Sequence, residues 1–266
     1  MKKILGFSFI LLIGLFLVGC KKDETKTIKV GISFQPMRDI LELISDDLKN
    51  EGYKLEIVEQ ALEVNNIALK DNEIDANMIQ HQYYLNLFNS AHNTNLVVVQ
   101  NIYHAIYALY SKDYKNIDEI PNGSNITLPD DASNTSRALY LLGQANLLTF
   151  KDNKKVNLTT DDILENKKNL TFNEMVPLTS IAQKYNETRL SVMYPTYARS
   201  LNLVGNAERL FVEKQDDVTK DYAISLVARE NNKDSEKLEI LKKYLRSDEV
   251  RTYLINEYGY ASTPAF

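Results

Sequence analysis

The chain has 266 residues, of which 44% are apolar and 25% are charged, and its formal net charge is −5. This apolar content excludes an intrinsically disordered chain, and the acidic balance argues against a nucleic-acid binder. A single cysteine excludes an intramolecular disulfide and a site built from several thiolates. At about 100–200 residues per domain, the length predicts two domains or one large one.

The first twenty residues have the features of a lipoprotein export signal. Lys2 and Lys3 precede an uncharged apolar run over 4–18, which is too short to span a bilayer comfortably. The run ends in L-V-G-C, which resembles the bacterial lipobox and places the sole cysteine, Cys20, where lipid is attached. We therefore predict a signal peptide over 1–19, a lipidated tether over 20–26, and a lipid anchor in the bacterial cell envelope, facing outside the cytoplasm. A signal anchor with an incidental cysteine is the alternative.

The mature chain alternates between strand and helix patterns. Strands are predicted at 27–33, 54–59, 74–79, 96–100, 102–110, 125–128, 190–193, 208–212 and 222–229. Helices are predicted at 37–48, 65–70, 82–91, 133–146 and 235–258, with shorter helical stretches near Asp161 and Leu178. This order predicts an α/β fold with parallel strands, in which 102–110 crosses to a second domain and 222–229 returns to the first.

Motifs for common enzyme chemistry are missing from the sequence. The glycines are not spaced as a dinucleotide or P-loop fingerprint requires, and no G-x-S-x-G elbow occurs. The three histidines form no H-E-x-x-H pair. We therefore expect no cofactor, no metal site and no enzymatic activity. A hydrolase built on scattered carboxylates is an alternative.

One candidate ligand site lies at the predicted helix start D-D-A-S-N-T-S-R-A-L. Ser133 and Asn134 are natural N-caps, and free N–H groups at a helix start favour an anion. Arg137 lies one turn further along the same face, where its planar guanidinium could hold a carboxylate through two hydrogen bonds. An ordinary capped helix with a surface arginine fits the same residues.

Other candidates follow a strand end or surround the predicted crossovers. Gln80 and His81 come at the carboxyl end of a predicted parallel strand, where open α/β sheets bind ligands. Tyr83 or Tyr84 would then form an apolar wall, although a lone histidine also fits a structural role. Tyrosines near the expected domain junction suit either a small-ligand pocket or a packed core, and these are Tyr103, Tyr107, Tyr194 and Tyr197.

An ordered set of short motifs resembles the NlpA-type, methionine-binding lipoproteins of ABC importers. The motifs are I-K-V-G-I-S (28–33), E-I-D-A-N (73–77), Q-H (80–81), L-Y-S (109–111), S-N-x-x-R-A-L (133–139), S-D-E-V (247–250) and the terminal P-A-F. The resemblance implies a two-lobed type II periplasmic-binding-protein fold, with lobe I over 28–108 and 222–266 and lobe II over 109–221. It also implies that Arg137 holds a ligand carboxylate, with Asn134 and His81 at the pocket.

Several pocket positions depart from the family pattern. The family stretch I-N-G-N-Y-A reads M-Y-P-T-Y-A here, with Thr196 in place of an asparagine that contacts the ligand backbone. A second family asparagine corresponds to Ile224, and the proline after Q-H to Tyr83. The expected ligand is thus methionine, another amino acid, a short peptide or another carboxylate, bound by Arg137, Asn134, His81, Gln80, Thr196, Tyr194, Tyr103 and Tyr83.

The resemblance implies delivery of that ligand to an ABC transporter permease, and we expect a monomer with no nucleic-acid partner. The alternative function is a surface or adhesion lipoprotein that keeps the fold but has lost or changed ligand binding. The substituted pocket positions motivate this alternative, and a cleft filled by the protein's own side chains would favour it.

Overall fold

A computed structural model describes residues 26–152, 157–203, 205 and 207–266. The predicted signal peptide, Cys20 and most of the tether lie outside this range. Lys26, assigned to the tether by the sequence, is instead the first residue of strand β1 (Lys26–Ile32), where its N–H donates to the carbonyl of Gly52. Among the described helices, none has the length and apolar character needed to cross a membrane.

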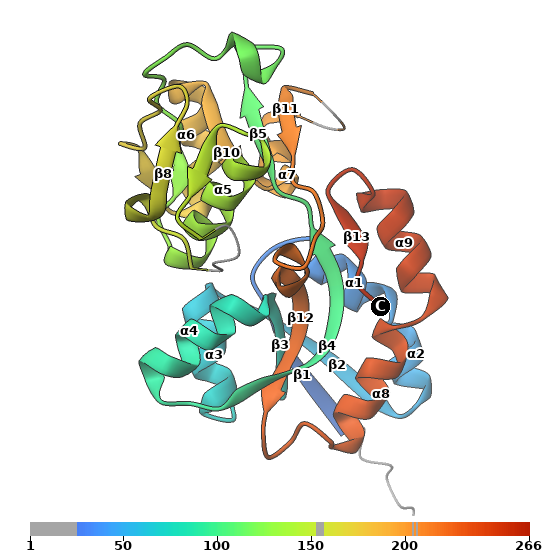
Figure 1. Cartoon of the computed structure of the whole chain (residues 1–266). Helices are drawn as coiled ribbons and strands as arrows, with labels where there is room; N and C mark the ends of the chain where they lie inside the picture. Colours follow the sequence, from blue (N-terminus) through green and yellow to red (C-terminus); the bar gives the residue numbers. More distant parts are fainter. Residues whose placement is uncertain (1–25, 153–156, 204, 206) are drawn as a thin grey trace, which may run out of the picture.

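The described residues form two α/β lobes, each built around its own main sheet (Figure 1). In spatial order, the larger sheet contains β13 (Ser262–Pro264), β4 (Leu96–Ala105), β12 (Ala223–Arg229), β3 (Ala76–Gln80), β1 and β2 (Tyr53–Glu59). β1 pairs in parallel with β2 and β3, whereas β12 runs antiparallel to both of its neighbours. This mixed sheet is what a βαβ series joined by a returning strand produces.

Helices cover both faces of the larger sheet. Figure 1 shows α3 (Leu62–Lys70) and α4 (Gln82–His92) on one side, and α1 (Met37–Leu43), α2 (Ser45–Asn50), α8 (Glu236–Leu245) and α9 (Asp248–Tyr258) on the other. Their apolar faces pack on strands whose side chains are buried, including Ile28, Val30 and Leu226. The edge strand β2 (Y-K-L-E-I-V-E) and the start of β1 (K-T-I-K-V-G-I) nonetheless alternate between polar and apolar residues.

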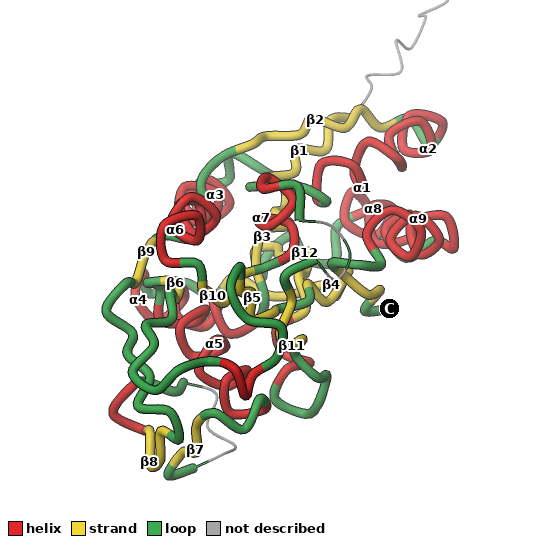
Figure 2. The backbone as a smooth tube through the Cα atoms, turned by 90° about the horizontal axis from the view of Figure 1, so that it is seen from above, coloured by secondary structure: helices red, strands yellow, loops and turns green. Residues whose placement is uncertain are grey.

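The second lobe has a three-stranded sheet in the order β10 (Leu190–Met193), β5 (Ala108–Ser111) and β11 (Arg209–Val212). Two short pairs flank it, formed by β6 (Leu128–Pro129) with β9 (Met175–Val176) and by β7 (Leu148–Phe150) with β8 (Ile163–Asn166). Its helices are α5 (Ala132–Gln144), α6 (Ile181–Thr188) and α7 (Pro195–Ala198). In Figure 2, β7 and β8 lie at the edge of this lobe, far from α8 and α9.

Two predicted helices are each divided in the structure. The expected helix over 235–258 ends at Leu245 and restarts at Asp248, because Ser247 caps α9 by accepting the Val250 N–H and two acidic residues follow it. The apolar positions Leu245 and Val250 are five residues apart, which already departs from helical spacing. The expected helix over 37–48 is likewise two helices that meet at Ile44.

The crossovers also differ from the prediction. The strands expected at 96–100 and 102–110 are instead one strand, β4, that ends at Ala105, followed by β5 from Ala108. The first crossover is therefore the short segment 106–107. The second is the longer segment between β11 and β12, which contains a 3₁₀ turn at Thr219–Tyr222. Near Asp161 and Leu178 the structure likewise has 3₁₀ turns, the latter leading into α6.

Candidate functional site

Residues from both lobes enclose a small cavity beside the first crossover, which we call the inner cavity. Its apolar lining consists of Phe34, Leu62, Ile79, Ala105, Leu178 and Ile224. Its polar lining consists of Gln80, His81, Tyr84, Asn134 and Tyr194. The cavity volume is about 30 Å³, close to the volume of one water molecule and far below the ~300–1,000 Å³ typical of ligand pockets. Side chains of the cleft itself therefore fill most of this space.

Two larger cavities adjoin the inner one between the lobes. The outer cavity, of about 320 Å³, shares Phe34, Leu62, Tyr84 and Leu178 with it and adds carboxylates from both lobes. The side cavity, of about 180 Å³, is lined by Phe34, Gln35, Thr196, Tyr197, Arg199 and Tyr258. The rings of Phe34 and Tyr197 lie 5.9 Å apart and line both of these larger cavities. This aromatic pair therefore separates the two openings.

Helix α5 begins with a cap that differs from the predicted one. Asp131, rather than Ser133 or Asn134, is the N-cap, and its carboxylate accepts the Asn134 N–H at 3.0 Å. The same carboxylate accepts hydrogen bonds from the Ser133 hydroxyl and the Asn134 side-chain amide. A carboxylate of the protein thus already lies at this helix start and satisfies one of its free backbone N–H groups, that of Asn134.

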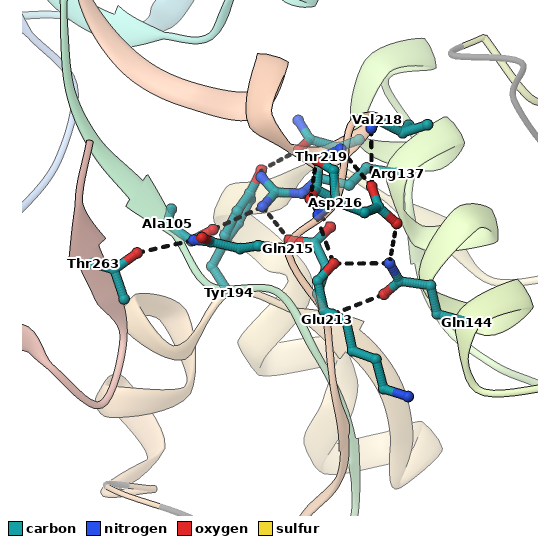
Figure 3. Close-up of polar contacts among 12 residues, drawn as sticks. Ala105, Arg137, Gln144, Tyr194, Glu213, Gln215, Asp216, Val218, Thr219 and Thr263 are labelled. Carbon is teal, nitrogen blue, oxygen red and sulfur yellow. Dashed lines mark hydrogen bonds and ion pairs between the residues drawn. The ribbon is translucent and has the colours of Figure 1, made fainter. Parts of the chain in front are cut away.

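Arg137 is fully buried and held by protein groups. Its Nε donates to Glu213 Oε1 at 2.8 Å, its Nη2 to Glu213 Oε2 at 2.5 Å and to the Ala105 carbonyl at 2.7 Å, and its Nη1 to the Tyr194 hydroxyl at 3.2 Å (Figure 3). The rings of Tyr107, Tyr194 and Tyr222 surround the guanidinium. Burial alone lowers the pKa of Arg137, but the Glu213 carboxylate more than offsets this and raises it.

The Arg137 contacts join the two crossovers. Ala105 ends β4 immediately before the first crossover, and Glu213 begins the second one directly after β11. The Glu213 N–H also donates to the Tyr107 carbonyl at 2.8 Å. Further along, Gln144 of α5 binds the backbone of Lys214 and the Asp216 carboxylate (Figure 3). Side chains of α5 are therefore hydrogen-bonded to residues at both crossovers, the segments about which the lobes would rotate.

Gln80 and His81 lie at the carboxyl end of β3, as the sequence predicts. The Gln80 amide is bonded to Asn66 and Asn77 within a buried network, which leaves its polar atoms engaged. His81 caps α4, and its Nδ1 accepts the Tyr84 N–H at 3.2 Å. The ring proton therefore resides on Nε2, and no described group accepts a hydrogen bond from it.

The remaining predicted residues are distributed around the cleft. Tyr194 lines the inner cavity, and its hydroxyl donates to Asn134 Oδ1 at 2.6 Å. Thr196 lines the side cavity instead. Tyr103 is buried with its hydroxyl unpartnered among the described residues, and Tyr83 packs edge-on against Tyr222. Tyr103, Tyr83 and Arg137 line none of the three cavities.

Sequence reasoning missed Glu213, Phe34 and Leu178. Glu213 follows the apolar strand L-F-V without any local sign that its carboxylate turns inward toward α5. Phe34 is a single apolar residue in a loop and Leu178 begins a short 3₁₀ turn, and no periodicity distinguishes either from other apolar positions. No cluster of metal-ligating side chains occurs in the described part of the chain.

His81 gives a testable pH dependence. Burial, and then the charge of Arg137, lower the pKa of His81 to about 3, whereas an unfolded histidine titrates near ~6.5. The difference between these two pKa values adds to the free energy of unfolding. This contribution is complete above pH ~6.5 and is lost as the pH falls toward 3, because in that range only the unfolded chain binds the proton. From pH 7 to pH 5 the loss is about 2 kcal/mol. In urea unfolding, His81→Asn keeps a capping side chain and should remove this component; an unchanged pH dependence would contradict it.

Two lobes that meet at paired crossovers, with cavities lined from both sides, define a type II substrate-binding protein (Figure 1). The family model for the NlpA lipoproteins matches residues 28–266, and the chain belongs to this family. It is a binding lipoprotein of the cell envelope and not an enzyme.

Similarity to individual proteins extends over most of the chain. The D-methionine-binding lipoprotein MetQ of Escherichia coli K12 is 34% identical, covering 89% of this chain and 88% of that protein. The crystal structure of lipoprotein Tp32 from Treponema pallidum superposes with a TM-score of 0.84 at 28% identity, covering 91% of this chain and all of that one. The structure of the methionine-binding protein MetQ gives 0.80 at 30% identity, covering 90% and 97%.

Proposed function

We propose that this protein is the substrate-binding lipoprotein of an ABC importer and closes its two lobes around a small amino-acid-like ligand. The observation that carries the proposal is the cleft itself, in which Phe34, Leu62 and Tyr84 of one lobe face Leu178 and Tyr197 of the other across about 320 Å³. This volume falls at the lower end of small-ligand pockets. The relatives named as methionine-binding support an amino acid as the ligand class.

Opening of the cleft would be a hinge motion at the two crossovers. The predicted division into 28–108 with 222–266, and 109–221, has its boundaries next to these crossovers, although β5 of the second lobe already begins at Ala108. The lipid on Cys20 would hold the protein at the membrane surface, outside the cytoplasm, where a permease receives the ligand. A monomer suffices, because one chain supplies both walls of the cleft.

A screen of amino acids, their derivatives and dipeptides tests this function by thermal unfolding. A ligand at 100 times its dissociation constant stabilises the folded state by about 2.7 kcal/mol. Phe34→Ala should weaken binding at least tenfold, because Phe34 lines all three cavities. Phe211→Ala is the matched control, since Phe211 packs on the core of the second lobe and lines none of them. Equal losses of ligand affinity in Phe34→Ala and Phe211→Ala would contradict a ligand site in the cleft.

The small inner cavity favours a second candidate function. A volume of about 30 Å³, with Asn134 and Gln80 bonded to protein groups, matches a surface lipoprotein whose cleft no longer takes a ligand. Absence of stabilisation by every compound in the screen, together with no small molecule in native mass spectrometry of freshly purified protein, would favour this candidate over transport.

A further inference from the structure

Protein groups accept hydrogen bonds from the edges of the Arg137 guanidinium that could otherwise bind a carboxylate. Glu213 takes Nε and one Nη2 hydrogen, the Ala105 carbonyl takes the other, and the Tyr194 hydroxyl takes one of the two on Nη1. The side chains of Arg137 and Glu213 are 1% and 3% exposed. The positive charge is therefore neutralised inside the protein rather than presented to the cleft.

Tyr194 stands between this cation and the inner cavity. Its hydroxyl accepts from Arg137 Nη1 and donates to Asn134 Oδ1, while the Asn134 amide donates to both carboxylate oxygens of Asp131 (Figure 3 shows Arg137 with Tyr194 and Glu213). Arg137, Tyr194, Asn134 and Asp131 thus form one linear series of hydrogen bonds. Tyr194 and Asn134 line the cavity with hydrogen-bonding groups that already have partners.

The walls of the cleft carry charges that oppose a free carboxylate. Glu63, Asp130 and Asp131 line the outer cavity, and among its described lining residues there is no lysine, arginine or histidine. Arg199 lines the side cavity, which the Phe34–Tyr197 pair separates from the outer one. Like charges repel each other more strongly in a partly desolvated site than in water. These carboxylates therefore disfavour a ligand that carries a free carboxylate.

The imidazole of His81 keeps a free donor at the inner cavity. His81 is 3% exposed, lines this cavity, and carries its proton on Nε2 with no acceptor among the described groups. A neutral N–H among apolar walls suits an uncharged acceptor such as an amide carbonyl. This donor gives the cleft one place to orient a ligand without using Arg137.

We propose that the cleft selects an amino-acid-like ligand whose carboxyl group is masked as an amide, with its ammonium group directed to the carboxylates of the outer cavity. This inference rests on the proposed transport function and narrows its ligand class. Arg137 acts as a structural link between the crossovers, and Tyr194 is the residue that shields it from the ligand.

Titration calorimetry with matched pairs tests the proposal at pH 6.5, using L-methionine against L-methioninamide and L-leucine against L-leucinamide. We expect the amide of at least one pair to bind the wild-type protein at least tenfold more tightly than the free acid. A tenfold preference for the free acid, or equal affinity, overturns this inference and leaves the transport function standing. No binding by any of the four compounds or by the wider screen overturns both.

Two hydroxyl deletions test the role of Tyr194. Tyr194→Phe frees Arg137 Nη1 toward the cavity and should shift the acid-to-amide affinity ratio at least threefold toward the acid. Tyr185→Phe is the matched control, because Tyr185 is also buried and its hydroxyl also donates a hydrogen bond to a side-chain oxygen, that of Glu208, away from the cleft. A ratio that stays at the wild-type value in Tyr194→Phe overturns the shielding role. Should this variant fail to fold, the wild-type ratio alone decides the ligand class.

Discussion

Arg137→Ala is expected to lower the free energy of unfolding by about 3–5 kcal/mol, because it leaves the Glu213 carboxylate buried without its cation. Glu213 is 3% exposed, and the Arg137 guanidinium is the cation paired with it. The same change removes a donor from the Ala105 carbonyl at the first crossover. For a chain of this size the loss corresponds to about 10 °C in Tm, measurable by calorimetry without any ligand.

An exposed ion pair serves as the control. Arg38 binds Glu59 at 2.6 Å, but the two side chains are 34% and 52% exposed, and such solvent-accessible pairs contribute about 0–1 kcal/mol. Arg38→Ala should therefore cost less than 1 kcal/mol. Equal losses in the two variants would contradict a structural role for Arg137. The double replacement Arg137→Met with Glu213→Leu should recover much of the loss, because apolar residues of similar volume can replace a buried ion pair.

This prediction changes how a binding assay on Arg137→Ala is read. The resemblance to the family implies that the loss of this arginine removes a carboxylate contact. In the structure, the same substitution also loosens the link between the two crossovers, so weaker binding would follow from either cause. Unfolding measured without ligand separates them, because a residue that only contacts the ligand adds nothing to stability in its absence.

The sequence predicts the elements well and the partners of buried side chains poorly. Periodicity predicts β10 at its observed bounds and β1 to within one residue at each end. Strand formation and the alternation that predicts it both depend on residues that are neighbours along the chain. Arg137 and Glu213 are 76 residues apart, and no local pattern links them. Likewise, Asp131 replaces the predicted caps because three potential capping residues compete within four positions, and only the entry angle of the chain decides between them.

The family resemblance places Asn134 and His81 at the cleft but leaves their chemistry open. Whether a polar side chain serves a ligand or a neighbour depends on which hydrogen bonds it already makes. Asn134 and Gln80 are saturated by contacts with Asp131 and Asn66 that come from packing of elements rather than from motif spacing. These competing contacts form only when the elements pack together in the folded protein. The order of motifs along the chain therefore locates the cleft but does not specify its ligand.

Gly31→Ala is expected to cost at least about 3 kcal/mol, combining overpacking with a displaced buried amide. A Cβ at this position would lie 1.9 Å from Asn65 Oδ1 and 2.8 Å from the Ile74 side chain. Asn65 is fully buried, and its Nδ2 donates to the carbonyls of Ile32 and Gln60 at 2.8 and 2.9 Å. The methyl group would force this amide away from both carbonyls.

The effect should reach the cleft, because Asn65 holds the start of α3 against the end of β1, and Leu62 of that turn lines the inner and outer cavities. Combining Gly31→Ala with Asn65→Ala tests the cause. If the clash with the amide dominates, the two losses are far from additive and the double variant is no less stable than Gly31→Ala alone. Additive losses in urea unfolding would place the cost elsewhere, at the contact with Ile74 or in the strand itself.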